Sequence, residues 1–191
     1  MSSDGAWSPS HVYTVGDVRE VVTYAAARGI RVIPEFDTPG HVARGWEKLG
    51  VLTQCYDATS GAATGLTGPL NPTLNATYDV LEKLYTDILA AFAPETFVHV
   101  GGDEVSKDCW QSNPQIVAWL KSHPEVQGFA GLETYFEQRL LDMLHAKGAS
   151  YAPSILSVVT RLAILSPFLT TPSARPCAFA LWQVCRVAGD L

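Results

Sequence analysis

In the first part of the chain, apolar residues recur with the 3.6-residue period of a helix, and a continuous apolar run typical of a buried strand comes next. Thr14 is followed three residues later by Asp17, an arrangement typical of a helix N-cap. Gly29 can end this helix because glycine adopts the left-handed conformation that helix C-termini favour. The apolar stripe would consist of Val18, Val21, Val22 and Ala25. The sequence therefore predicts a helix between Thr14 and Gly29.

Two apolar runs predict buried strands. The first covers residues 30–36 (IRVIPEF), although Pro34 is unfavourable inside a strand because it has no amide proton. The second covers residues 97–100 (FVHV), whose valine and aromatic content favours a strand, and Gly101-Gly102 ends it. Residues 57–72 are rich in glycine, threonine and proline, and we expect a loop there.

Three further helices are predicted from helical periodicity. They cover about residues 77–92, a segment opened by Asn113-Pro114, and about residues 132–147, with Gly148 ending the last. Their inward faces would carry Val80, Leu81, Leu84, Ile88 and Leu89, then Ile116, Val117, Trp119 and Leu120, then Tyr135, Phe136, Leu140, Leu141 and Leu144. Helices that alternate with strands predict an α/β fold of parallel βα units. Two strands cannot bury these helices, so either later residues add strands or the chain is part of a larger barrel.

The composition changes after residue 147. Serine, threonine, proline and alanine alternate with apolar runs, and no acidic residue occurs from position 148 until Asp190. No helical or strand period persists in this part of the chain. We therefore predict two segments, a domain of two or three βα units at residues 1–147 and a divergent tail at residues 148–191.

Charge and composition exclude several classes of protein. Of 191 residues, 47% are apolar and 17% charged, which fits a globular chain. A net charge of -6 without a lysine or arginine stripe argues against a nucleic-acid partner. We expect no signal peptide, because no basic region precedes an apolar core, and no membrane span, because Arg161 and Pro167 interrupt the longest apolar stretch. The four cysteines lack the spacing of a zinc site.

Two adjacent carboxylates, Asp103 and Glu104, follow the second predicted strand. The carboxyl ends of parallel strands are where catalytic groups gather in α/β folds. Two carboxylates held side by side do not both ionise freely, so one can stay protonated as a general acid. Alternatively, Asp103 caps a following helix and Glu104 favours its first turn. The four residues GGDE alone leave these two interpretations about even.

The first predicted strand also ends in acidic residues and a tight turn, DTPGH, which contains Asp37 and His41. A histidine near a carboxylate pair can orient it or share its proton, whereas an isolated DTPGH sequence fits a simple β-turn. Two neighbouring strands that both end this way favour a site, because a parallel sheet places such loops side by side. Trp46, Tyr56 and Trp110 lie near these loops and offer stacking surfaces for a sugar, although each alone fits a packing role.

Four ordered motifs together carry a family resemblance. They are IRVIPEFDTPGH (30–41), LTQCYD (52–57), GPLNPTLNATY (68–78) and FVHVGGDEVSKDCWQSNP (97–114). With them, residues 5–147 resemble the family 20 glycoside hydrolases, most closely the lysosomal-type β-N-acetylhexosaminidases. The resemblance implies part of a (β/α)8 TIM barrel and an enzyme that removes terminal β-linked N-acetylglucosamine or N-acetylgalactosamine by substrate-assisted retention.

The resemblance also implies roles for single residues. Glu104 would be the general acid and then the base, and Asp103 would hold the 2-acetamido group of the substrate. His41 and Asp37 would belong to the substrate-binding or hydrogen-bond network behind Glu104. No metal or organic cofactor is implied, and the partners would be amino-sugar glycoconjugates or oligosaccharides, with a homo- or heterodimer for the full-length family.

Two further features agree with a lysosomal or secreted protein. The resemblance matches Cys55 and Cys109 to a disulfide of the animal lysosomal enzymes, and this bond would join the loop after one strand to the loop after the next. Asn75-Ala76-Thr77 is a candidate glycosylation sequon.

The chain also departs from the family pattern. The family barrel has eight strands, and this sequence matches only the third and fourth, without the arginine of the first strand or the acid that partners His41. Residues 148–191 match no family motif. The alternative hypothesis is therefore a catalytically inactive fragment or a sugar-binding remnant of such an enzyme. An unrelated α/β enzyme of phosphoryl chemistry ranks far below, because no GxxxxGK[ST] phosphate loop is present.

Overall fold

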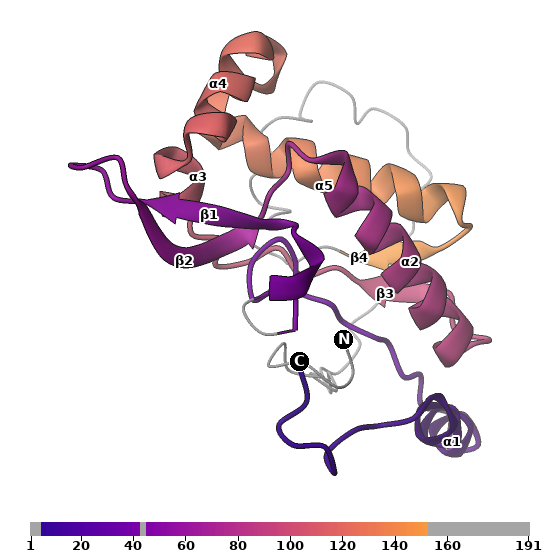
Figure 1. The fold of residues 1–191 in the computed structure, drawn as a ribbon. Coiled ribbons are helices and arrows are strands. Elements are labelled where there is room, and N and C mark those ends of the chain that lie inside the picture. Colours follow the sequence, from indigo (N-terminus) through magenta and orange to yellow (C-terminus); the bar gives the residue numbers. More distant parts are fainter. Residues whose placement is uncertain (1–4, 43–44, 153–191) are drawn as a thin grey trace, which may run out of the picture.

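The computed structural model describes residues 5–42 and 45–152, in which helices and extended segments alternate along the chain (Figure 1). The helices are α1 (Val15–Ala26), α2 (Asn75–Phe92), α3 (Asp108–Ser112), α4 (Pro114–Ser122) and α5 (Gly128–Ala146), with the short 3-10 helices η1 (Glu47–Leu49) and η2 (Pro124–Val126). The strands are β1 (Leu52–Tyr56), β2 (Ala63–Leu70), β3 (Phe97–His99) and β4 (Ser150–Ala152).

Three extended segments lie parallel to one another, with β3 in the middle. On one side β3 pairs with β4, in a register that places His99 opposite Ala152. On the other side Glu35 forms a bridge with His99, where the His99 amide donates to the Pro34 carbonyl at 2.8 Å and the Phe36 amide donates to the His99 carbonyl at 3.0 Å. Because helices connect these parallel segments, the fold is α/β, as the sequence predicts.

The strand predicted at residues 30–36 is shorter than expected. Only Glu35 makes a strand bridge, and the extended pairing continues from there to Thr38, whose amide donates to the Val100 carbonyl at 3.3 Å. The next ladder bond towards the N-terminus would need an amide proton at position 34. Pro34 has none, so the pairing cannot extend back into residues 30–33.

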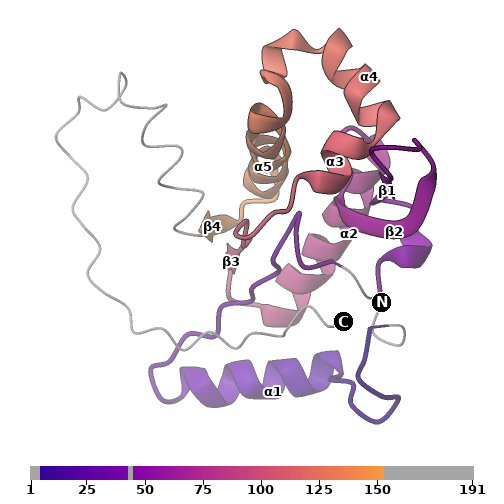
Figure 2. The ribbon, with the colours of Figure 1, turned by 90° about the vertical axis from the view of Figure 1, so that its left-hand side faces the viewer.

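Helices α2 and α5 pack against one face of the parallel segments and enclose the main core with them (Figures 1 and 2). Val98 and Val100 of the β3 segment contribute to this core. The helices contribute Leu81, Tyr85, Ile88, Phe136, Leu140, Leu141 and Leu144. The apolar stripes predicted for both helices are confirmed, except that Tyr135 packs in a second cluster.

A β-hairpin occupies much of the segment predicted to be a loop. Strands β1 and β2 pair antiparallel, with register shifts between the pairs Leu52–Leu70, Gln54–Thr67 and Tyr56–Ala63. The sequence of β2 (ATGLTGPL) has neither alternating apolar residues nor high strand propensity. The strand forms because β1 supplies its hydrogen-bond partners, which local sequence does not reveal.

The second, smaller core lies where α3, α4 and η2 meet the start of α5, around the buried side chains of Trp110, Ile116, Val126 and Leu132. The predicted cap of α4 is confirmed, because the Asn113 side chain accepts from the amides of Gln115 at 2.9 Å and Ile116 at 3.2 Å. Helix α5 begins at Gly128, four residues before its predicted start.

Helix α1 lies at the periphery of the described residues, next to α2 (Figure 2). Its predicted capping box is present, with the Thr14 hydroxyl accepting from the Asp17 amide at 3.1 Å. Of its predicted apolar stripe, Val22 and Ala25 are buried, whereas Val21 is exposed. Helix α1 therefore leaves part of its apolar face uncovered within the described residues.

The tail predicted at residues 148–191 falls almost entirely outside the described residues, which end at Ala152. Strand β4 lies in its first residues and continues the parallel sheet. The predicted boundary after residue 147 stays a prediction. None of the helices in the described ranges is both long and apolar enough to cross a membrane.

Candidate active site

The acidic residues singled out in the sequence meet at the carboxyl ends of two neighbouring parallel segments. Residues 37–41 follow the Glu35 bridge, and residues 101–104 follow β3. The two turns are in contact, because a side chain placed on Gly40 would lie 3.6 Å from the Asp103 carbonyl oxygen. The expectation that a parallel sheet brings these loops together is confirmed.

Asp37 lies behind the turn that carries the carboxylate pair. Its Oδ1 accepts a hydrogen bond from the Gly102 amide at 2.9 Å, and its side chain is only 17% exposed. Burial raises the pKa of the Asp37 carboxyl group, the Gly102 hydrogen bond opposes this rise, and the charge of Asp103 adds to it. Asp37 therefore fixes the glycine turn and holds its own proton more tightly than an exposed aspartate does.

Gly101 is required at its position for two reasons. Its φ of +66° belongs to the left-handed region, and a Cβ there would overlap the backbone and carboxylate of Asp37. The close approach of Gly101 to Asp37 lets the acid-bearing turn lie directly on the neighbouring segment.

His41 lies between two carboxylates. Its Nε2 atom is 3.6 Å from Asp37 Oδ2 and 3.6 Å from Glu104 Oε2. A proton on Nε2 can therefore be directed towards either carboxylate with a small movement of the ring. The arrangement Asp37, His41, Glu104 forms a chain of ionisable groups that leads from a partly buried acid to an exposed one.

Glu104 is the exposed end of this chain, with 75% of its side-chain surface open to solvent. Glu104 and His41 both have left-handed backbones, with φ of 56° and 51°. This conformation costs about 1–2 kcal/mol for residues other than glycine, and such residues cluster at functional sites. A third residue with such a backbone, Gln127, precedes α5 away from this contact, whereas the side chains of His41 and Glu104 approach each other.

Asp103 is half-buried beside Glu104, and its charge acts on Asp37. No helix starts at this pair, because α3 begins at Asp108 with Lys107 at its N-cap position. The alternative that Asp103 caps a following helix is therefore wrong.

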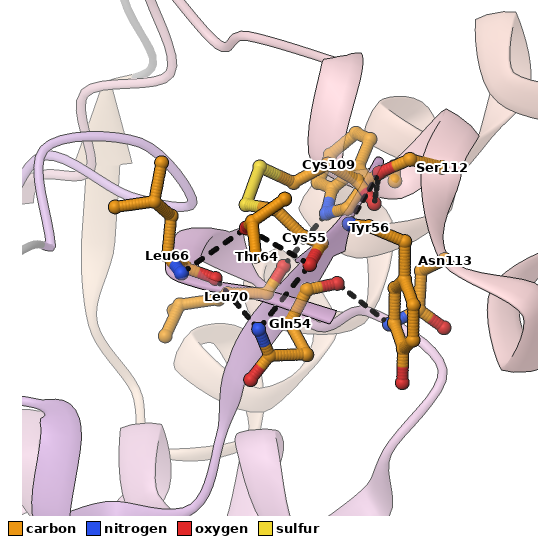
Figure 3. The surroundings of a disulfide bond; sticks show 10 residues. Gln54, Cys55, Tyr56, Thr64, Leu66, Leu70, Cys109, Ser112 and Asn113 are labelled. Carbon is orange, nitrogen blue, oxygen red and sulfur yellow. Dashed lines mark hydrogen bonds between the residues drawn. A yellow bond between two sulfur atoms is a disulfide. The ribbon is translucent and has the colours of Figure 1, made fainter. Parts of the chain in front are cut away.

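A disulfide anchors the far end of the loop that carries Asp103 and Glu104 (Figure 3). Cys55 in β1 and Cys109 in α3 are bonded, with a Cα–Cα distance of 4.4 Å, so the predicted bond is confirmed. It joins the hairpin to a helix, whereas the sequence suggested two loops.

Hydrogen bonds around the disulfide hold α3 against the hairpin. The Tyr56 amide donates to Ser112 Oγ at 3.1 Å, and Asn113 Nδ2 donates to the Gln54 carbonyl at 2.9 Å (Figure 3). On the loop itself, Lys107 pairs with Glu133 of α5 at 3.0 Å. The acid-bearing loop is therefore fixed to both neighbouring elements.

Two of the three aromatic residues proposed as sugar-stacking surfaces are core residues. Trp110 is completely buried, and its Nε1 donates to the Leu70 carbonyl at 3.0 Å. Trp46 is also buried, and Tyr56 is half-buried. The stacking role is wrong for Trp46 and Trp110, and their packing role is the one observed.

The sequence interpretation missed a second histidine–carboxylate contact below the site. His99 Nδ1 lies 3.4 Å from Glu35 Oε1, and the same atom accepts from the Gly101 amide at 3.2 Å. The signal that points to His99 is its position between the buried residues Val98 and Val100, because alternate strand residues face opposite sides.

No group of three or more His, Cys, Asp or Glu side chains that could hold a metal ion occurs among residues 5–42 and 45–152. Asp37 accepts from the Gly102 amide, and His41 lies between Asp37 and Glu104. Two acids and an imidazole at these distances are groups that can exchange a proton.

The chain matches the family model described as "Glycosyl hydrolase family 20, catalytic domain" over residues 1–155. It is 44% identical over 146 residues to β-hexosaminidase subunit beta of Felis catus, which covers 75% of this chain and 27% of that protein. It is 42% identical over 153 residues to β-hexosaminidase subunit alpha of Bos taurus, which covers 79% of this chain and 28% of that protein. The chain therefore spans about a quarter of the length of these relatives.

Solved structures show the same arrangement of elements. The chitobiase of Flavobacterium johnsoniae superposes with a TM-score of 0.63 at 29% identity, over 76% of this chain and 22% of that one. An exo-β-N-acetylglucosaminidase of Vibrio harveyi, solved with N-acetylglucosamine, superposes with a TM-score of 0.60 at 28% identity, over 74% and 22% of the two chains.

Proposed function

This chain belongs to glycosyl hydrolase family 20, and from that membership we propose that it supplies the acid/base group of a β-N-acetylhexosaminidase. The proposed substrates are oligosaccharides or glycoconjugates that end in β-linked N-acetylglucosamine or N-acetylgalactosamine. The relatives named above are β-hexosaminidase subunits. Because the chain spans about a quarter of their length, activity of this polypeptide is itself part of the proposal.

In the first step, Glu104 gives its proton to the glycosidic oxygen as the bond to the anomeric carbon breaks. The carbonyl oxygen of the substrate's own 2-acetamido group attacks the anomeric carbon and forms an oxazolinium ring. Asp103 orients the acetamido group and balances the positive charge of this ring. This order departs from retaining enzymes in which a carboxylate is the nucleophile.

In the second step, the Glu104 carboxylate takes a proton from a water molecule. The resulting hydroxide equivalent attacks the anomeric carbon, the oxazolinium ring opens, and the sugar leaves with retained configuration. Glu104 ends the cycle protonated, ready for the next substrate. His41 and Asp37 support this exchange from behind, because an imidazole between two carboxylates can stabilise either protonation state of Glu104.

One observation carries the proposal: His41 Nε2 lies 3.6 Å from both Asp37 and Glu104, while Glu104 is 75% exposed. A surface glutamate without a function needs no histidine beside it and no strained backbone. A general acid needs both a route for its proton and access to the substrate.

The test is release of a chromogenic phenol from an N-acetylglucosaminide by the wild-type chain and by Glu104→Gln. General acid–base catalysis contributes about 10²–10⁴-fold, so the variant should be slower by a factor in this range. Glu20→Gln, at an exposed position of α1, is the matched control and should keep the wild-type rate. A folded wild type that is no faster than Glu104→Gln would contradict the proposal.

We also propose that the parallel segments are a sector of the (β/α)8 barrel that the sequence suggests. Residues 34–38, β3 and β4 are neighbours in chain order, with α2 and α5 as the connecting helices, as in consecutive units of such a barrel. The candidate site lies at the carboxyl ends of the segments, which is the catalytic face of these barrels.

A second candidate function is sugar binding without hydrolysis. It is favoured by the small number of parallel segments in the described residues, because the remaining strands of a barrel would surround the sugar. Calorimetric titration with an acetamido-sugar analogue distinguishes the two. Binding by wild type together with equal, negligible hydrolysis by wild type and Glu104→Gln would support the binding function.

The cellular site is proposed to be lysosomal or extracellular. The Cys55–Cys109 disulfide favours an oxidising compartment. Asn75, the candidate glycosylation residue, is exposed as the first residue of α2, and its Oδ1 accepts from Arg139 at 3.2 Å, which leaves Nδ2 as the attachment atom. A homo- or heterodimer is proposed for the full-length family only.

A further inference from the structure

His99 Nδ1 is placed between a hydrogen-bond donor and a hydrogen-bond acceptor. The Gly101 amide donates to this nitrogen at 3.2 Å, and Glu35 Oε1 lies 3.4 Å from the same nitrogen. Both side chains are largely buried, with 20% of His99 and 11% of Glu35 exposed. The Gly101 amide and the Glu35 carboxylate therefore compete for His99 Nδ1 in a partly buried environment.

An imidazole nitrogen makes one hydrogen bond in the plane of its ring, either through its lone pair or through its proton. When Nδ1 carries no proton, it can accept from the Gly101 amide, and the Glu35 carboxylate then faces a lone pair. When Nδ1 carries a proton, it can donate to Glu35, and the Gly101 amide then loses its acceptor. The protonation of a single nitrogen decides which contact is made.

The two alternatives have different consequences for the candidate site. Gly101 begins the turn that ends in Asp103 and Glu104, and the next amide, Gly102, is held by Asp37 at 2.9 Å. With both glycine amides bonded, the turn is fixed at two successive positions. With the Gly101 amide released, only the Asp37 bond remains.

We propose that His99 and Glu35 form a proton-dependent support for the turn that carries the acid pair. His99 with an unprotonated Nδ1 holds the turn by accepting from Gly101, and His99 protonated on both ring nitrogens turns to Glu35 and frees the Gly101 amide. His99 is a positioning residue, since it acts through the turn and not on the substrate. The inference rests on the proposed function only in assigning Asp103 and Glu104 as the acid pair.

Besides Glu35 and Asp37, titratable groups near this turn include Glu133 and Glu137 of α5, which line a small pocket together with Gly101. Glu35 and Asp37 come from the neighbouring segment, and β4 places Ala152 opposite His99. On the helix side, the adjacent strand residues Val98 and Val100 pack into the main core. Asp37 leads on to His41, a second imidazole beside this turn. Substitution of His99 can therefore show whether a change in the Gly101 amide resonance is caused by His99 or by His41.

The test is an NMR titration of the full ¹⁵N-labelled chain that follows the His99 ring nitrogens and the Gly101 amide together. As the pH is varied, the Gly101 amide resonance should change together with the resonances of the His99 ring nitrogens. In His99→Asn, the side-chain oxygen can replace Nδ1 as acceptor but does not titrate, so the Gly101 shift should be lost.

Two further variants complete the experiment. Glu35→Gln replaces the carboxylate that competes with the Gly101 amide for His99 Nδ1 by an uncharged amide, so the change in the Gly101 resonance should be smaller than in the wild type. His123→Asn, which changes an imidazole stacked on Trp119 at the end of α4, is the matched control and should leave the Gly101 titration unchanged.

A Gly101 amide that stays constant while His99 titrates would overturn the inference, and so would a Gly101 shift that persists in His99→Asn. Assaying hydrolysis on the same samples separates this inference from the proposed function. A coupled titration without hydrolysis would contradict the function and support the positioning role, whereas hydrolysis with an uncoupled Gly101 would overturn the positioning role alone.

Discussion

At the scale of single residues, the site depends on backbone conformations that are unfavourable for most side chains. His41, Gly101 and Glu104 all have left-handed φ values, and they surround the contact between His41 and Glu104. Asp37 joins them through its bond to Gly102. The backbone conformation therefore determines where the carboxylates lie. Substitutions of the residues that set this conformation should damage the site as much as substitutions of the acids.

Gly101→Ala should destabilise the chain more than Gly29→Ala does. Both glycines have left-handed backbones, with φ of 66° and 72°, so each alanine adds about 1–2 kcal/mol of backbone strain. At Gly29 nothing lies within 4 Å of a new Cβ, whereas at Gly101 the Cβ would overlap Asp37. Urea denaturation of both variants gives the comparison. Equal losses of unfolding free energy would show that the contact between Gly101 and Asp37 adds no constraint.

The free energy of unfolding that Asp37 contributes should decrease as the pH rises above the acidic range. Burial raises its pKa in the folded chain above the ordinary value of about 3.9. The folded chain therefore binds this proton more tightly than the unfolded chain, and the resulting stability is complete below the unfolded pKa and lost as pH rises through the folded pKa.

Thermal unfolding from pH 3 to pH 8 tests the effect of Asp37. Asp37→Asn keeps an oxygen that can accept from Gly102 but cannot ionise, so its stability should fall less than that of the wild type over this range. Asp79→Asn, at an exposed position of α2, is the control and should retain the wild-type slope. A wild-type slope in Asp37→Asn would mean that another group causes the pH dependence.

At the scale of elements, the residue Asn113 links two structures. Its side-chain oxygen caps α4, and its Nδ2 donates to the Gln54 carbonyl of β1. Asn113→Ala removes both functions and should cost about 1–2 kcal/mol through the cap alone. Asn113→Asp keeps the cap acceptor and loses the donor to Gln54. Chemical denaturation should rank the wild type above Asp, and Asp above Ala; equal stability of the wild type and Ala would contradict a role for either bond.

The elements also show which parts of the fold a sequence can predict. Helices α2, α4 and α5 were predictable because a helix makes its hydrogen bonds locally and its apolar stripe repeats over several turns. Strand β2 was not, because its partner β1 determines it and its sequence carries no alternation. The strand expected at residues 30–36 is reduced to a bridge at Glu35. The next hydrogen bond of the ladder would need the amide proton that Pro34 lacks, and the sequence alone does not show that the ladder needs a donor at this position.

The candidate site, like the fold, was predictable where local sequence determines it and not where the pairing of distant segments does. Asp37, His41, Asp103 and Glu104 follow strand ends, so their sequence positions alone suggest that they meet. The contact of Glu35 with His99 depends on the register between two segments far apart in the chain, and no local pattern specifies that register.

At the scale of the whole molecule, the Cys55–Cys109 disulfide connects the hairpin to the end of the acid-bearing loop. Its removal in a Cys55→Ser/Cys109→Ser double variant should lower the unfolding free energy by about 2–5 kcal/mol. Helix α3 should also lose its fixed place on the hairpin, which loosens the loop at residues 103–107 and slows any hydrolysis. Denaturation of the wild type and the double variant with and without a reducing agent is the measurement.

The reducing agent provides the internal control. Reduction should bring the wild type down to the stability of the double variant and leave the double variant unchanged. A double variant as stable as the oxidised wild type would show that the hydrogen bonds from Ser112 and Asn113 are sufficient to hold α3.

The four residues of the candidate site all come from two consecutive parallel segments and the stretch between them, from position 37 to position 104. None of the side chains that make the contacts among Asp37, His41 and Glu104 belongs to α5 or β4. A ribosome has therefore synthesised every one of these groups before the chain reaches the third parallel segment. For the same reason, a genetic exchange with breakpoints outside this stretch carries the acid/base group to a new protein in one piece.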